Sequence, residues 1–132
     1  MAALYAAAFP AARPWTAAEF STLLTPETGF LISAPKAFAI GRVVADEAEL
    51  ITLAVAPERR RHGLGGQLLS DFEAMAKTRG ATRAFLEVAA DNIPARALYH
   101  AANWCESGRR KGYYKRANRA LIDALLLEKQ LT

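Results

Sequence analysis

The stretch LAVAPERRRHGLGGQLL, residues 53–69, places an apolar run, a basic cluster and three glycines directly before a helical pattern. Glycine costs about 1 kcal/mol relative to alanine inside a helix. A strand that enters a glycine-rich turn and then a helix presents unpaired backbone N–H groups and the positive end of the helix dipole at one point. The stretch therefore predicts an anion-binding turn. Glycines that only permit close packing are the alternative interpretation.

Two common phosphate-binding motifs do not fit this spacing. No lysine followed by serine or threonine comes after the glycines, as it does in a nucleotide P-loop. The three-glycine dinucleotide fingerprint, with its acid about 20 residues later, is absent as well. The pattern is instead Arg60, two residues, Gly63, one residue and Gly65.

The composition indicates one domain with one core, because 52% of the 132 residues are hydrophobic and 23% are charged. The net charge of +4 is concentrated in residues 59–62 and 109–115, which favours an anionic ligand over a long polyanion. The longest apolar runs are far shorter than the roughly 20 residues of a membrane helix. The single cysteine, Cys105, is expected to be buried, without a chemical role, in a reducing compartment.

Periodicity and turn signals divide the chain into alternating elements. Residues 2–9 and 16–25 have helical patterns. The apolar stretch at the N-terminus precedes Arg13, which argues against a secretory signal; a transit peptide is the alternative to a short first helix. Apolar runs at 30–32, 37–44 and 49–55 predict a strand meander whose last strand is central and covered on both faces.

The second half of the chain continues this alternation. Leu64, Leu68, Phe72 and Met75 recur at helical spacing, and Arg79 with Gly80 predicts the end of that helix. A strand at 83–88, a helix at 92–103 and two strands at 104–110 and 120–131 are predicted to follow. The order predicts an α/β or α+β domain with a mixed sheet.

Residues 53–69 resemble the acetyl-coenzyme A signature of the GNAT family of N-acetyltransferases, and FLEVAADNIPARALYHAANW resembles that family's next strand and helix. Within the family the chain is most similar to the bacterial ribosomal-protein alanine N-acetyltransferases. Their typical features are present as Pro14 with Trp15, residues 86–88, Asn92, residues 97–99, and Tyr113 with Tyr114. The resemblance runs from about Phe9 to Leu131.

The resemblance implies a single N-acetyltransferase domain over residues 1–132. Its fold would be α/β (α+β), with a mixed, mostly antiparallel central sheet flanked by helices. Family members usually begin with a strand before the first helix, whereas this chain starts inside that helix. We therefore expect the sheet to lack its usual first strand.

The resemblance also implies acetyl-coenzyme A as co-substrate, with no metal. Backbone N–H groups of residues 61–66 would bind its pyrophosphate, and the arginines would add longer-range attraction. Asn92 would cap its helix and contact the cofactor. The strand before the glycines splays from its neighbour in the family, so that Val55 would polarise the thioester carbonyl. The implied cofactor-binding residues are Leu53, Ala54, Val55, Arg60, Arg61, His62, Gly63, Leu64, Gly65, Gly66, Asn92 and Tyr99.

Glu87 and Tyr99 are the candidate catalytic pair. An N-terminal amine, with a pKa of about 8, is easier to deprotonate than a lysine at about 10.4, and a partly desolvated carboxylate can accept its proton. Tyrosine is protonated at pH 7 and can donate to the leaving thiolate. A solvated acid and a buried core tyrosine are the alternatives. The resemblance assigns Glu87 as base and Tyr99 as acid.

The acceptor implied by the resemblance is a protein N-terminal amine, specifically the N-terminal alanine of a small-subunit ribosomal protein, in the cytoplasm. Trp15, Tyr113 and Tyr114 would contact it, the two tyrosines from the loop between the last two strands; ordinary turn aromatics are the alternative. Acetylation of a small-molecule amine is the rival activity. A non-catalytic acetyl-coenzyme A binding module is the other rival, and the presence of both Glu87 and Tyr99 argues against it.

The expected partners follow from the same features. No recognised nucleic-acid-binding motif or basic helix occurs in the sequence, so we expect no direct nucleic acid binding and no membrane binding. A monomer or a weak dimer is expected.

Overall fold

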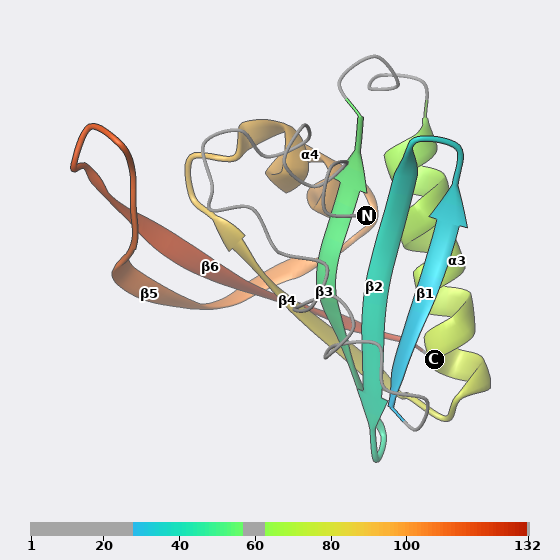
Figure 1. Ribbon diagram of the computed structural model, residues 1–132. Helices are drawn as coiled ribbons and strands as arrows, with labels where there is room; N and C mark the ends of the chain where they lie inside the picture. Colours follow the sequence, from blue (N-terminus) through green and yellow to red (C-terminus); the bar gives the residue numbers. More distant parts are fainter. Residues whose placement is uncertain (1–27, 57–62, 132) are drawn as a thin grey trace.

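The computed structural model describes residues 28–56 and 63–131, which form one sheet and two helices (Figure 1). The six strands lie in the order β1-β2-β3-β4-β6-β5. The strands are β1 (Gly29–Ala34), β2 (Ala37–Val44), β3 (Glu47–Val55), β4 (Arg83–Ala89), β5 (Cys105–Lys115) and β6 (Leu121–Gln130), and the helices are α3 (Leu64–Thr78) and α4 (Ile93–Ala101).

The sheet is mixed and mostly antiparallel, as predicted. Among the six described strands, the neighbours β3 and β4 run parallel, and the other neighbouring pairs are antiparallel. The strand patterns at 30–32, 37–44, 49–55, 83–88 and 120–131 are confirmed. The predicted helices at 2–9 and 16–25, and the position of the missing first strand, lie outside the described residues. Neither helix that the structure describes is long and apolar enough to cross a membrane.

Tight turns join the first three strands into the predicted meander. Lys36 and Ala45, in these turns, adopt left-handed φ values of 60° and 56°. The pairing of β2 with β3 shifts register between Ile40 and Gly41. A Cβ at Gly41 would lie 2.5 Å from Phe30 Cζ and 2.6 Å from Phe72 Cε1. Glycine at this bulge therefore allows two rings to pack against the backbone of the sheet.

Helix α3 packs its apolar side against β1, β2 and β3. Its buried residues are Leu68, Leu69, Phe72 and Ala76. Met75 was expected on this face but is 37% exposed, because the buried stripe is centred between Leu69 and Phe72 and Met75 lies at its edge. Arg79 and Gly80 end the helix as predicted, and Gly80 adopts a left-handed φ of 93°.

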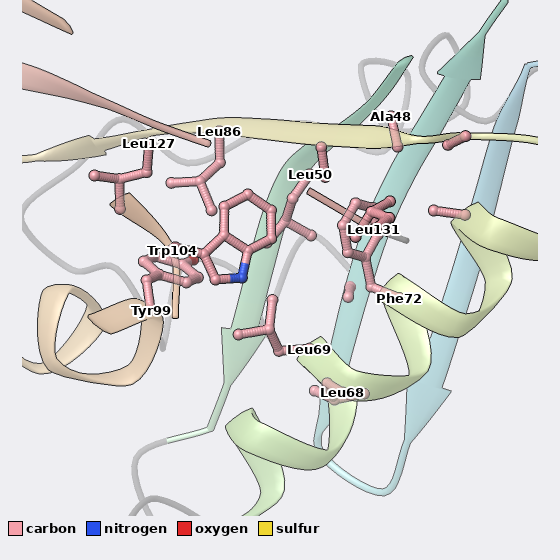
Figure 2. Close-up of a cluster of buried hydrophobic side chains, with 14 of the residues drawn as sticks. Ala48, Leu50, Leu68, Leu69, Phe72, Leu86, Tyr99, Trp104, Leu127 and Leu131 are labelled. Atoms are coloured by element: carbon pink, nitrogen blue, oxygen red, sulfur yellow. The ribbon is translucent and has the colours of Figure 1, made fainter. Parts of the chain in front are cut away.

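A chain of aromatic rings crosses the core between α3, the sheet and α4. Phe72 stacks on Phe30 with ring centroids 5.8 Å apart, and Trp104 lies 6.5 Å from Phe72 and 6.1 Å from Tyr99. Figure 2 shows Phe72 and Leu69 of α3 pointing toward the sheet, with Trp104 and Tyr99 beside Leu86. This cluster fixes α4 against the same core that holds α3.

Strand β3 is central, as predicted, and its burial varies along its length. Ala48 and Leu50 are buried beneath α3, and Leu53 and Val55 pack in part against the same core, because the register shift leaves Ile51 unpaired and turns them to this face. On the opposite face Ala54 is fully buried, whereas Glu49 is partly exposed. Both faces thus carry buried residues, as predicted, but neither face is buried along the whole strand. Glu87 of β4 lies on the face opposite α3, because the parallel register pairs Glu49 with Phe85 and Glu87 is two residues further along the same strand.

Candidate active site

The parallel strands β3 and β4 diverge after three residue pairs. Residues 47–49 pair with residues 83–85, and neither strand pairs with the other beyond that point, although β3 continues to Val55 and β4 to Ala89. Figure 1 shows β3 and β4 separating toward the ends from which the chain leads into α3 and α4. The splay that the family resemblance implied is thus present. It brings the ends of two strands and the starts of two helices to one region.

The three glycines at the start of α3 have different structural reasons. Gly63 is the N-cap residue and adopts a left-handed conformation with φ 76°. As a glycine, it provides no side-chain cap for the helix. A Cβ at Gly65 would lie 3.3 Å from Leu98 Cδ2 of α4, so this glycine does permit close packing. A Cβ at Gly66 would meet only Leu98 Cδ1, at the ordinary distance of 4.0 Å. Packing therefore accounts for Gly65 and does not account for Gly63 or Gly66.

The first turn of α3 is suited to an anion. Its first intrahelical hydrogen bond is donated by Gln67 N to Gly63 O, so the N–H groups before Gln67 have no acceptor within the helix. The turn contains no acidic residue. Arg60, Arg61 and His62 lie outside the described residues, as does Trp15.

Asn92 caps α4, as predicted. Its Oδ1 accepts a hydrogen bond from Ala95 N at 3.3 Å, and Pro94 occupies the first turn. Next to it, Asp91 receives two hydrogen bonds from Arg116, at 2.9 Å and 2.5 Å. These bonds lower the pKa of Asp91 and tie the start of α4 to the residue that follows β5.

Glu87 lies on the sheet face opposite α3, away from its core-facing neighbours. Leu86 and Val88 point into the core, so the strand alternation directs Glu87 to the other side. Its side chain is 27% exposed, and its Oε1 lies 3.2 Å from Arg110 Nη2. A carboxylate here is partly desolvated and has a cation as its partner.

Tyr99 lies within the core and is 7% exposed. Burial raises its pKa to about 12, and its hydroxyl makes no hydrogen bond to another residue in the described ranges. A phenol in this environment is protonated at neutral pH, which is the state that a proton donor needs. Ring and ion-pair contacts among the described residues join Tyr99 to Trp104 and Glu87 to Arg110, and none joins Tyr99 to Glu87.

Tyr113 and Tyr114 lie in β5, and the prediction that they belong to a loop is wrong. Their strand continues to Lys115, because a register shift between Arg110 and Tyr114 absorbs Gly112 as a bulge with φ 60°. The Gly112 N–H donates to Asp123 Oδ1 at 2.9 Å. The resemblance placed both tyrosines in the loop between the last two strands, whereas pairing with β6 extends β5 through Gly112 as a bulge.

The two tyrosine rings form an edge-to-face pair with centroids 5.1 Å apart. Arg110 lies 5.1 Å above the Tyr113 ring, and Arg116 lies 5.6 Å above the Tyr114 ring. Tyr113 is 54% exposed. The hairpin of β5 and β6 that carries these rings projects from the rest of the sheet (Figure 1, orange to red).

Three residues of this region were missed by the sequence analysis. Arg110 and Arg116 were counted only as net charge, and Asp123 received no role at all. Their partners are distant in the chain, so no local spacing reveals them. Cys105 was expected to be buried but is exposed, because it begins the edge strand β5 and its neighbour Trp104 takes the inward position.

A mixed sheet whose parallel central pair splays beside a glycine-capped helix is the architecture of an acyl-coenzyme A-dependent acetyltransferase. The chain belongs to the acetyltransferase (GNAT) family, whose model matches residues 4–104.

Similar proteins carry more specific names. The crystal structure of the ribosomal-protein-S18-alanine N-acetyltransferase from Escherichia coli superposes with a TM-score of 0.84 and 33% identity, over 98% of this chain and 86% of that one. The ribosomal protein bS18-alanine N-acetyltransferase of Salmonella typhimurium is 44% identical over 81 residues, which are 61% of this chain and 55% of that protein. A Bacillus subtilis protein named putative ribosomal protein bS18-alanine N-acetyltransferase is 32% identical over 107 residues. These residues are 76% of this chain and 71% of the Bacillus protein. The match thus spans about half the length of the Salmonella relative.

Proposed function

We propose that this chain is an acetyl-coenzyme A-dependent N-acetyltransferase that acts on a protein N-terminal α-amine. The acceptor is the N-terminal alanine of a small-subunit ribosomal protein, in the cytoplasm, and residues 1–132 act as one domain. The observation that carries this proposal is the divergence of β3 from β4 beside the left-handed Gly63. Similarity to the Escherichia coli and Salmonella enzymes supports the choice of acceptor.

The residues around the splay fit the two ends of acetyl-coenzyme A. The free N–H groups in the first turn of α3, with Gly63, Gly65 and Gly66, would bind its pyrophosphate. Arg60, Arg61 and His62 would add positive charge, and Asn92 would contact the cofactor from the start of α4. The backbone of Leu53, Ala54 and Val55 lies where β3 has left β4, so it would pair with the pantetheine arm. Acetyl-coenzyme A supplies an activated acyl carbon and a thiolate leaving group.

Glu87 would act as the general base. It accepts the proton that the acceptor amine loses as its nitrogen forms the new C–N bond. The side chain suits this role because it is partly buried, lies on the sheet face away from the main core and is held by a cation. An N-terminal amine needs only a modest base, since its pKa is about 8.

Tyr99 would act as the general acid. When the C–S bond breaks, its hydroxyl donates a proton to the departing sulfur, so that the thiol and not the thiolate leaves. The raised pKa of about 12 keeps this hydroxyl protonated around pH 8, where the acceptor amine becomes neutral. Trp15, Tyr113 and Tyr114 would contact the acceptor chain, the two tyrosines as an edge-to-face pair.

A peptide panel tests this function directly. The full chain is incubated with acetyl-coenzyme A and with short peptides that differ only in their first residue, alongside small-molecule amines. We expect the highest kcat/KM for peptides that begin with alanine. Equal or faster acetylation of the small amines contradicts the proposed acceptor, and binding of acetyl-coenzyme A without any transfer contradicts the activity.

A further inference from the structure

Arg110 connects the candidate base to the candidate acceptor surface. One guanidinium nitrogen lies 3.2 Å from Glu87 Oε1, and the guanidinium carbon lies 5.1 Å from the centre of the Tyr113 ring. Glu87 and Arg110 come from β4 and β5, on either side of β6, where Glu87 pairs with Leu126 and Arg110 pairs with Ala124. A long side chain is needed to cross the two strand spacings, which are about 5 Å each.

Gly108, two residues before Arg110 in β5, has no side chain that could block the path from Arg110 to Glu87. Gly108 pairs with Leu126, the same residue that faces Glu87, and a Cβ at Gly108 would lie 3.0 Å from Leu126 Cδ1. Because Gly108 has no side chain, Arg110 is the residue of β5 that reaches Glu87 over this face. The contact is therefore built into the register of the hairpin.

Among the described residues, Arg110 makes fewer hydrogen bonds than two neighbouring arginines do. Arg109 donates hydrogen bonds to Glu106 and Asp123, and Arg116 donates two to Asp91. Arg110 approaches Glu87 at ion-pair distance but makes no hydrogen bond within the described part of the chain. Its side chain is 53% exposed. A planar guanidinium with five donors is thus presented to solvent directly beside a candidate base.

The chemistry of the acceptor indicates a ligand for these donors. In a peptide, the α-amine and the carbonyl oxygen of the first residue are three bonds apart and lie about 3 Å from each other. An amine that approaches Glu87 therefore brings an amide carbonyl close to Arg110. The ε-amine of lysine has no carbonyl at this distance, and neither has a simple alkylamine.

We propose that Arg110 is a specificity-determining residue that donates a hydrogen bond to the first carbonyl oxygen of the acceptor peptide while Glu87 receives its α-amine. This inference rests on the proposed transfer to a protein N-terminus. Arg110 thereby selects α-amines of peptides over other amines. Its contact with Tyr113 holds the guanidinium beside the candidate acceptor surface.

The test compares two acceptors on one variant. The first is a peptide that begins with alanine, and the second is the same peptide with its first amide replaced by an (E)-alkene, which keeps the shape and removes the carbonyl oxygen. Arg110→Gln should lower kcat/KM for the normal peptide about tenfold to a hundredfold, as expected when a hydrogen bond from a charged donor is lost. It should change kcat/KM for the alkene peptide by less than about twofold, because the lost contact was never made.

Two further variants complete the experiment. Arg42→Gln breaks an ion pair of the same kind, between Arg42 and Glu49, on β2 and β3, and should leave both acceptors unaffected. Arg110→Lys keeps the charge but not the planar fork, and should recover only part of the loss. Circular dichroism and acetyl-coenzyme A binding confirm that each variant is folded.

The outcomes separate this inference from the proposed function. If Arg110→Gln lowers kcat/KM for both acceptors equally, Arg110 acts by orienting Glu87 and the inference is overturned. If neither value changes, Arg110 has no part in acceptor binding. If the wild-type chain acetylates small amines and no peptide, the proposed function itself fails.

Discussion

Asp123 of β6 holds the backbone of Gly112 in β5 through a hydrogen bond of 2.9 Å from the Gly112 N–H to Asp123 Oδ1. The second carboxylate oxygen of Asp123 accepts from Arg109 Nη1 at 3.2 Å. The Gly112 bond is the main cause of the lowered pKa of Asp123. One side chain thus fixes the bulge that precedes the tyrosine pair.

Asp123→Ala should release this bulge and raise KM for the acceptor peptide several-fold, because Tyr113 and Tyr114 lose their fixed placement. Acetyl-coenzyme A binding should not change, since α3 and β3 are distant from the hairpin. Steady-state kinetics with an alanine-starting peptide measures the first effect and calorimetry measures the second. Glu106→Ala is the matched control, because it also removes a partner of Arg109 and leaves Gly112 held. Equal KM values for the two variants would show that the bulge does not contribute to acceptor binding.

Glu87→Gln should reduce kcat by the 10²- to 10⁴-fold that is typical of a lost general base. The rate should recover in part as pH rises, because a growing fraction of the acceptor amine is then neutral without help. The pH dependence of kcat/KM checks both statements. Glu49→Gln, which alters another glutamate paired with an arginine, serves as the control and should retain wild-type turnover. Wild-type turnover in Glu87→Gln would exclude Glu87 as the base.

Tyr99→Phe should lower kcat without recovery at high pH, because the variant lacks a proton donor and a more basic solution supplies none. This pH profile distinguishes it from Glu87→Gln. The ring remains, so the contact with Trp104 and the core should persist. Identical pH profiles for the two variants would still place both residues in the active site. They would contradict the assignment of Tyr99 as acid and Glu87 as base.

The raised pKa of Tyr99 also predicts an alkaline loss of stability. Since its pKa is about 12 when folded and about 10 when unfolded, the protonated form stabilises the fold fully below pH 10. That contribution, about 3 kcal/mol, is lost as pH rises from 10 through 12. Denaturant unfolding at pH 9 and pH 11 should therefore show a smaller decline for Tyr99→Phe than for the wild type. The same decline in both proteins would show that Tyr99 is not desolvated.

Gly66→Ala should have opposite effects on stability and on cofactor binding. The substitution stabilises the helix by about 1 kcal/mol, and its methyl group meets only Leu98 at an ordinary contact distance. The same methyl group stands in the first turn, where the phosphate oxygens would approach, so the Kd for acetyl-coenzyme A should rise. Thermal unfolding without ligand and calorimetry with it measure the two effects. An unchanged Kd in the more stable variant would contradict a phosphate-binding role for this glycine.

Gly41→Ala should destabilise the protein by about 1–3 kcal/mol, because its Cβ would overlap the stacked rings of Phe30 and Phe72. Denaturant unfolding measures the loss, and Gly66→Ala is the matched control at an open position. A wild-type midpoint for Gly41→Ala would show that the two rings can move apart at little cost.

The sequence by itself determined the local elements and the residues at their ends. The apolar run at 83–88 predicted the strand that carries Glu87, and the glycines with Asn92 marked two helix starts; the structure confirms all three elements. These features depend on neighbours only a few residues away, for which strand and helix periods are reliable guides. The family motifs rest on the same short segments.

The tertiary structure decided how these segments meet. The divergence of β3 from β4, the continuation of β5 through Gly112 and the exposure of Cys105 each depend on which strand lies beside which. The pairing of Glu87 with Arg110 spans 23 positions of sequence and exists because β6 sets both registers. Strand register and bulges are settled by packing between distant segments, since each strand alone is compatible with several pairings.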